Sequence, residues 1–141
     1  ILEEADVASD IGDRKKHVAL KPNLVTAKDP SEGATTHREI LAGAIEYLQD
    51  HGFSDITVME GSWVGDRTGE AFRAAGYDQV CSRYQVPFED LQKDTWKEYD
   101  AAGMKIKLCD KAAAVDYMIN LPVLKGHCQT TVTCALKIIK G

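Results

Sequence analysis

The chain has 141 residues, of which 28% are charged and 44% are hydrophobic, and its formal net charge is −5. This composition is typical of a soluble globular domain, and no apolar run is long enough for a transmembrane helix. The acidic balance excludes a broad nucleic-acid-binding surface and binding to anionic membranes. Because no signal peptide is visible at the start, the sequence predicts a cytoplasmic protein.

The first elements are a polar segment, a strand and a loop. Residues 1–16 predict a remnant of a helix that is followed by a Gly-Asp turn. An apolar run over 17–21, stopped by Pro22, is typical of a buried parallel strand. Residues 26–35 contain proline, glycine and serine, which predicts a loop.

The clearest helix follows this loop. Thr36 and Glu39 form a capping-box pattern, with Thr36 as the expected N-cap. Apolar residues repeat at helical spacing over 40–48, and Gly52 lies where a helix ends. Residues 55–59 then predict a second strand. A strand, a helix and a strand in this order predict a right-handed parallel βαβ unit.

The second half of the chain continues to alternate helices with strands. Residues 68–75 and 77–84 predict helices, and 86–88 predict a short strand. Residues 104–108 alternate polar with apolar side chains, which is typical of an edge or hairpin strand. Residues 116–121 predict another buried strand.

The end of the chain predicts a helix. Val132, Ala135, Leu136 and Ile139 have helical spacing, so we place the start of this helix at 130–131. The whole pattern predicts one α/β domain over 1–141, with a three-layer, mainly parallel sheet. A Rossmann-like or flavodoxin-like arrangement would fit, and the order of the strands stays open.

Candidate ligand-binding residues follow the predicted strands directly. In open parallel sheets, ligands bind outside the carboxyl ends of the strands. The residues near those ends share charge or hydrogen-bonding capacity: Lys21, Asn23, Thr35, Thr36, His37, Glu60, Ser62, Asn120, Lys125 and His127. We expect them to converge on one cationic rim, although the chain is acidic overall.

A small anion, such as a carboxylate or a phosphate, is the ligand that this rim favours. The lysines would supply charge, an imidazole would exchange protons near neutral pH, and Glu60 would serve as a base or a metal ligand. The catalytic candidates are therefore His37, Glu60, Lys125 and His127. The ligand-binding candidates are Lys21, Asn23, Thr35, Thr36, Ser62 and Asn120.

Several common chemistries are not supported by the sequence. There is no G-x-G-x-x-G dinucleotide fingerprint and no P-loop, and Gly61-Ser62 lacks the spacing of a nucleophile elbow. The cysteines form no Cys-x-x-Cys pair, so we expect no metal site and no cofactor within this chain. Cys128 follows His127 and is interpreted as a small half-buried residue rather than a thiolate.

Taken together, these motifs resemble the domain of unknown function 362 family. The resemblance covers 17–141 and leaves 1–16 as an N-terminal extension. It rests on five motifs, namely Lys21-Pro22-Asn23-Leu24-Val25, Gly33-Ala34-Thr35-Thr36-His37, Glu60-Gly61-Ser62, the run from Asn120 to His127, and Ala135-Leu136-Lys137 with Gly141.

The resemblance implies a domain without a settled reaction, often joined to a Cys-rich ferredoxin-like module. A 4Fe-4S cluster would then lie in a separate segment or a partner. Family domains continue with further strands, so the resemblance also implies a truncated C-terminus. We would then expect exposed Ile138 and Ile139 side chains and self-association of the chain.

Three functions stay open at this point. The first is a small-molecule site for an anionic ligand, with an enzymatic role. The second is an accessory domain of an iron–sulfur electron-transfer protein whose cluster lies outside this chain. The third is a non-catalytic interaction module.

Overall fold

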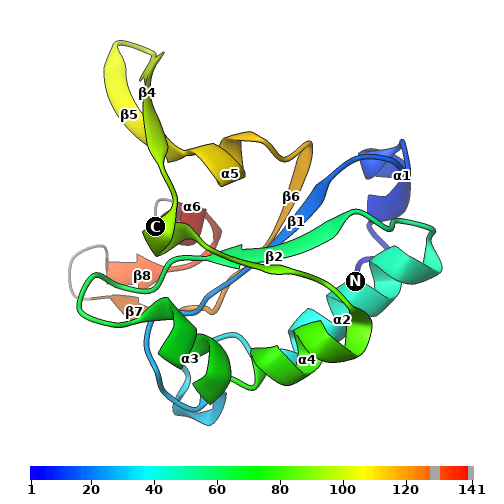
Figure 1. Cartoon of the computed structure of the whole chain (residues 1–141), viewed down its shortest axis with the longest axis horizontal. Helices are drawn as coiled ribbons and strands as arrows, with labels where there is room; N and C mark the ends of the chain where they lie inside the picture. The colour runs from blue at the N-terminus through cyan, green and yellow to red at the C-terminus, as the bar shows by residue number, and fades with distance from the viewer. Residues whose placement is uncertain (128–130, 140–141) are drawn as a thin grey trace.

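A computed structural model describes residues 1–127 and 131–139, with the side chain of Leu136 excepted (Figure 1). A parallel four-stranded sheet in the order β3-β2-β1-β6 forms its centre. Its strands are β1 (Val18–Pro22), β2 (Ile56–Glu60), β3 (Phe88–Asp90) and β6 (Tyr117–Leu121). The predicted α/β class with a parallel sheet is therefore confirmed. The strand order is new information from the tertiary structure.

One face of the sheet packs against the hydrophobic core. This core joins β-strand residues such as Leu20 and Ile119 to the apolar stripe of α2, including Leu41 and Ile45. Gly52 follows α2 with a φ of +83°, as expected for a residue that ends a helix. The helices on this side are α1 (Val7–Ile11), α2 (Arg38–Asp50), α3 (Thr68–Ala74) and α4 (Tyr77–Tyr84).

The opposite face of the sheet is covered less completely. Met118 alternates with Ile119 and lines a groove with Ala112 and Ile139. These two residues come from α5 (Asp110–Ala113) and α6 (Ala135–Ile139). Helical segments thus lie on both faces of the sheet, in three layers (Figure 1).

The remaining elements are two hairpins and two short turns of 3₁₀ helix. The hairpins are β4 (Trp96–Ala101) with β5 (Met104–Cys109), and β7 (Lys125–His127) with β8 (Thr131–Thr133). The 3₁₀ turns are η1 (Pro30–Glu32) and η2 (Leu91–Lys93). The β4–β5 hairpin projects from the body of the molecule (Figure 1). The strand predicted at 104–108 is therefore a hairpin strand, β5.

The β4–β5 hairpin has two chemically different faces. Tyr99, Ile106 and other apolar side chains are exposed on one face. On the other face, the Lys107 ammonium lies 3.9 Å from the centre of the Trp96 ring, and Lys105 pairs with Glu98 at 2.9 Å. The sequence analysis missed β4 because charged residues interrupt its apolar positions.

Two boundary expectations are wrong. The short strand expected at 86–88 lies at Phe88–Asp90. The helix expected from 130–131 begins only at Ala135, and Val132 lies in β8 instead. The reason is that Thr131, Val132 and Thr133 are β-branched residues, which favour strands over helices.

The expected exposure of the C-terminal isoleucines is confirmed for Ile139 but is wrong for Ile138. Ile138 is only 4% exposed, whereas Ile139 is 57% exposed. The reason is that Ile138 points into a cavity beside β1 and β2, where neighbouring residues cover it.

Candidate functional site

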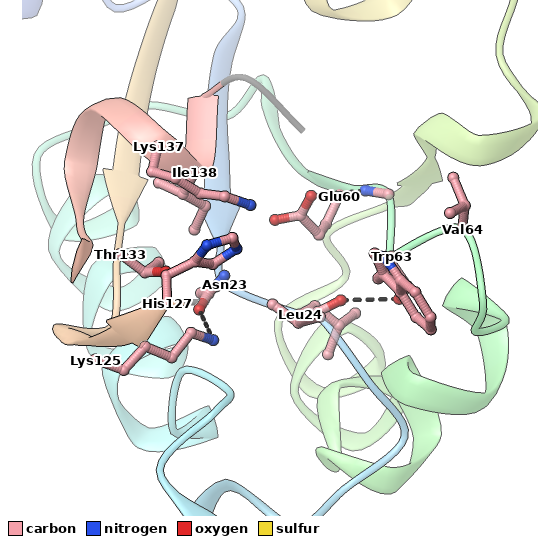
Figure 2. A pocket seen from close by; sticks show the side chains of 13 residues that line it. Asn23, Leu24, Glu60, Trp63, Val64, Lys125, His127, Thr133, Lys137 and Ile138 are labelled. Carbon is pink, nitrogen blue, oxygen red and sulfur yellow. Dashed lines mark hydrogen bonds between the residues drawn. The ribbon is translucent and has the colours of Figure 1, made fainter. Parts of the chain in front are cut away.

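A cavity of about 180 Å³ lies at the carboxyl ends of the parallel strands (Figure 2). Segments after β1 and β2, the β7–β8 hairpin and α6 form its walls. β2 and β6 lie on opposite sides of β1. The chain therefore adds β2 and β3 on one side of β1 and later adds β6 on the other side. Ligand sites of open α/β sheets lie at such a switch point. The lining residues are Asn23, Leu24, Val25, Glu60, Gly61, Ser62, Trp63, Val64, Lys125, His127, Thr133, Lys137 and Ile138.

A buried ion pair lies at the back of this region. Lys21 Nζ donates to both carboxylate oxygens of Glu60, at 2.7 and 2.8 Å. Glu60 Oε1 also accepts a hydrogen bond from the Gly61 N–H at 2.8 Å. Burial raises the pKa of the Glu60 carboxyl, and the Lys21 ammonium and the Gly61 amide oppose that rise. The two charges neutralise each other, so Lys21 adds no net charge to the cavity.

Thr36 bridges two strand ends rather than capping α2. Its hydroxyl accepts from the Asn23 N–H at 2.9 Å and donates to the Leu121 carbonyl at 2.6 Å. The N-cap of α2 is His37, which makes no capping hydrogen bond with its side chain. The expected capping box is therefore wrong. The physical reason is that the Thr36 hydroxyl is engaged by two backbone partners, the Asn23 N–H just after β1 and the Leu121 carbonyl at the end of β6.

Lys125 and Lys137 give the cavity an unbalanced positive charge. Lys125 Nζ donates to Asn23 Oδ1 at 2.6 Å (Figure 2) and also to the Ala34 carbonyl. Both acceptors are neutral. Burial lowers the pKa of Lys125, repulsion from Lys137 lowers it further, and the Glu60 carboxylate opposes this fall. Within the described residues, neither lysine forms a salt bridge. Because Glu60 is already paired with Lys21, the two ammonium groups leave an excess of positive charge that favours an anion in this cavity.

Thr133 provides a hydroxyl without a partner on the same wall. It is 2% exposed, and its Oγ1 makes no hydrogen bond with any described residue. Figure 2 shows Thr133 next to His127 and Lys125. A buried hydroxyl without a partner costs about 1–3 kcal/mol. A ligand oxygen in the cavity would supply the missing partner.

The wall opposite the lysines is mostly apolar. Leu24, Trp63 and Val64 lie on this wall (Figure 2), and Val25 and Ser62 also line the cavity. The Ser62 hydroxyl donates to the Leu24 carbonyl at 2.8 Å, and the Ser62 amide donates to Thr68 Oγ1 at 3.1 Å. The Ser62 hydroxyl therefore holds the two loops of this wall together.

The expected convergence holds for part of the candidate set. Asn23, Glu60, Ser62, Lys125 and His127 line the cavity, and Lys21 reaches it through Glu60.

The other candidates lie outside the cavity. The expectation that His37 lies there is wrong. His37 is the N-cap of α2 and lines a separate pocket with Asp29, Arg38 and Arg73. Asn120 Nδ2 donates to the Ala135 carbonyl at 2.7 Å, while Asn120 Oδ1 and Thr35 Oγ1 are buried without a partner.

The lining residues that were not candidates from the sequence include Trp63, Thr133 and Lys137. Trp63 directly follows Ser62, so its position after β2 was a usable signal. Thr133 and Lys137 follow β6 by more than ten residues. No sequence signal places them at the cavity, because the β7–β8 hairpin folds back to bring them there.

The described residues contain no cluster of three or more histidine, cysteine or acidic side chains that could hold a metal ion. Cys81 is buried in α4, Cys109 is half-buried at the end of β5, and Cys134 is exposed. The interpretations of Cys128 and Thr130 lie outside the described residues. In the described part of the chain, no helix is long and apolar enough to cross a membrane.

Comparisons with known proteins give two matches and one negative result. The "Thylakoid-associated protein sll1697" of Synechocystis sp. (strain ATCC 27184 / PCC 6803 / Kazusa) is 28% identical over 130 residues. That alignment covers 92% of this chain but only 39% of the relative, so the chain spans about two fifths of its length. No solved structure matches significantly. Residues 18–141 match a domain of unknown function, DUF362, and the chain therefore belongs to the DUF362 family.

Proposed function

We propose that the cavity between β1, β2 and the β7–β8 hairpin binds a small anionic ligand, with a carboxylate or a phosphate as the recognised group. The unbalanced charge of Lys125 and Lys137 carries this proposal. Since the chain is acidic overall, a pair of lysines whose nearest carboxylate, Glu60, is already paired with Lys21 is a specific local feature. The partnerless Thr133 hydroxyl supports the same ligand, because it can donate to an anionic oxygen.

The polar residues that line the cavity would have different roles in binding the anion. Lys125 and Lys137 would neutralise the anion, and Thr133 would orient it. Asn23 holds the Lys125 ammonium in place through its side-chain oxygen at 2.6 Å. His127 lines the same wall, so in an enzymatic role its imidazole would transfer a proton to or from the bound ligand.

Isothermal titration calorimetry with sodium acetate and inorganic phosphate tests this proposal. We expect millimolar or tighter binding by the unmodified chain. Lys137→Met should weaken binding at least fivefold, which corresponds to about 1 kcal/mol for one charge-assisted contact. Lys137 is the cleaner variant, since Lys125 also bonds to Asn23 and Ala34.

Lys15→Met is the matched control. Lys15 is exposed and precedes β1, so it lies at the opposite end of the strand from the cavity. Its loss removes the same charge from the chain and should leave the affinity unchanged. Equal weakening by Lys15→Met and Lys137→Met would show that only net charge matters. That result, or the absence of binding to either anion, would refute the proposed site.

A further inference from the structure

Trp63 stands at the mouth of the cavity, opposite the lysines. Its side chain is 64% exposed, and the adjacent Val64 is 93% exposed. Figure 2 shows both residues on the apolar wall, across the cavity from Lys125 and His127. A ligand with its charged group at the lysines would therefore have its remaining atoms beside the indole.

The backbone of Trp63 is held firmly, so its position is well defined. Its N–H donates to the Val25 carbonyl at 3.1 Å. Its carbonyl accepts from the Asp66 N–H at 2.8 Å and from Gln92 Nε2 at 3.2 Å. These bonds tie the loop after β2 to the loop after β1 and to η2.

The indole itself lies against Gly65. A Cβ placed on Gly65 would come within 1.9 Å of Trp63 Cζ3, so only glycine leaves room for the ring in this position. The ring is therefore in contact with Gly65 and is 64% exposed elsewhere. An indole that is braced in this way and largely exposed can stack on a second flat ring.

We infer that the ligand is a small anion with a planar ring, whose charged group lies at Lys125 and Lys137 and whose ring stacks on Trp63. This inference rests on the proposed function and adds the ligand class. The cavity of about 180 Å³ is small for an organic ligand, which favours one ring rather than an extended chain.

Three carboxylates that differ in the group attached to the carboxylate provide the test. Acetate has only the anionic group, cyclohexanecarboxylate adds a non-planar apolar ring, and benzoate adds a planar one. We expect benzoate to bind about tenfold more tightly than acetate and clearly more tightly than cyclohexanecarboxylate. Trp63→Ala should abolish this preference, so that the ratio of the benzoate affinity to the acetate affinity falls from about ten to about one. Gly65→Ala should have the same selective effect, since it displaces the ring without removing it.

Tryptophan fluorescence gives an independent readout. The chain has two tryptophans, Trp63 and Trp96, and the latter lies in the β4–β5 hairpin. In a Trp96→Phe background, benzoate should change the emission of Trp63, whereas acetate should not.

The outcomes separate the two proposals. If acetate and phosphate bind but benzoate binds no more tightly than acetate, the ring inference is overturned and the proposed anion site stands. Equal binding of benzoate and cyclohexanecarboxylate also overturns stacking on Trp63. If none of these anions binds, both the inference and the proposed function fail.

Discussion

Lys21 and Glu60 form an ion pair between neighbouring parallel strands, in which Lys21 Nζ donates to both carboxylate oxygens, and each side chain is only 4% exposed. The two residues are separated by 39 positions in the sequence. Their pairing neutralises one lysine at the end of β1 and leaves Lys125 and Lys137 as the source of positive charge in the cavity. The ion pair is therefore a structural support of the site, and its energetics can be tested directly.

Lys21→Met should lower the free energy of unfolding by about 3–5 kcal/mol, because it leaves the buried Glu60 carboxylate without its partner. The double variant Lys21→Met/Glu60→Leu should recover much of this loss, since it removes both buried charges. Urea unfolding followed by circular dichroism measures both quantities. Additive losses in the double variant would contradict a coupled pair.

The Thr36 hydroxyl should be needed as a bridge between β1 and β6. Thr36→Val removes both hydrogen bonds and should cost about 1–3 kcal/mol of unfolding free energy. Thr36→Ser keeps the hydroxyl and should cost less. Thr36→Asp separates this role from helix capping, because aspartate is a good N-cap but its carboxylate would face the Leu121 carbonyl. Wild-type stability of Thr36→Asp would argue against the bridge.

Tyr77 anchors α4 to the segment that carries Thr36. Its hydroxyl donates to the Thr36 carbonyl at 2.6 Å, and burial strongly raises its pKa. Tyr77→Phe should therefore lower the unfolding free energy by about 1–3 kcal/mol, because the buried carbonyl loses its donor. Tyr84→Phe is the matched control in the same helix, since the hydroxyl of Tyr84 bonds to Glu46 at the surface. Its effect should stay within about 0.5 kcal/mol in thermal or urea unfolding.

Acetate binding should weaken as the pH rises through the pKa of Lys125. Burial and the neighbouring Lys137 hold this pKa below its usual value of 10.5, so the loss should occur at lower pH than for an ordinary lysine. Lys137→Met removes the repulsion and should shift the loss of acetate affinity to higher pH. Acetate stays ionised across this range, so its own titration does not contribute. Titrations between pH 7 and 10.5 would show the shift, and an unchanged profile would contradict repulsion between the two lysines.

Local patterns in the sequence determined the fold class and part of the site. The apolar runs at β1 and β6, the helical stripe of α2 and the glycine behind it each depend on residues close together in the chain. They predict an alternation of strands and helices, and hence a parallel sheet. The principle that ligands lie at the carboxyl ends of parallel strands then pointed to Asn23, Glu60, Ser62, Lys125 and His127.

Only the tertiary structure decided which partners these residues meet. Thr36 shows the reason most clearly: its local pattern is that of a helix cap, but packing places backbone groups from the end of β6 and the residue after β1 against its hydroxyl. Lys137 and Thr133 reach the cavity because a hairpin folds back after β6, and the Lys21–Glu60 pair depends on which strand lies beside β1. Strand order and hairpin return bring together residues that are distant in the chain, and no local periodicity encodes that proximity.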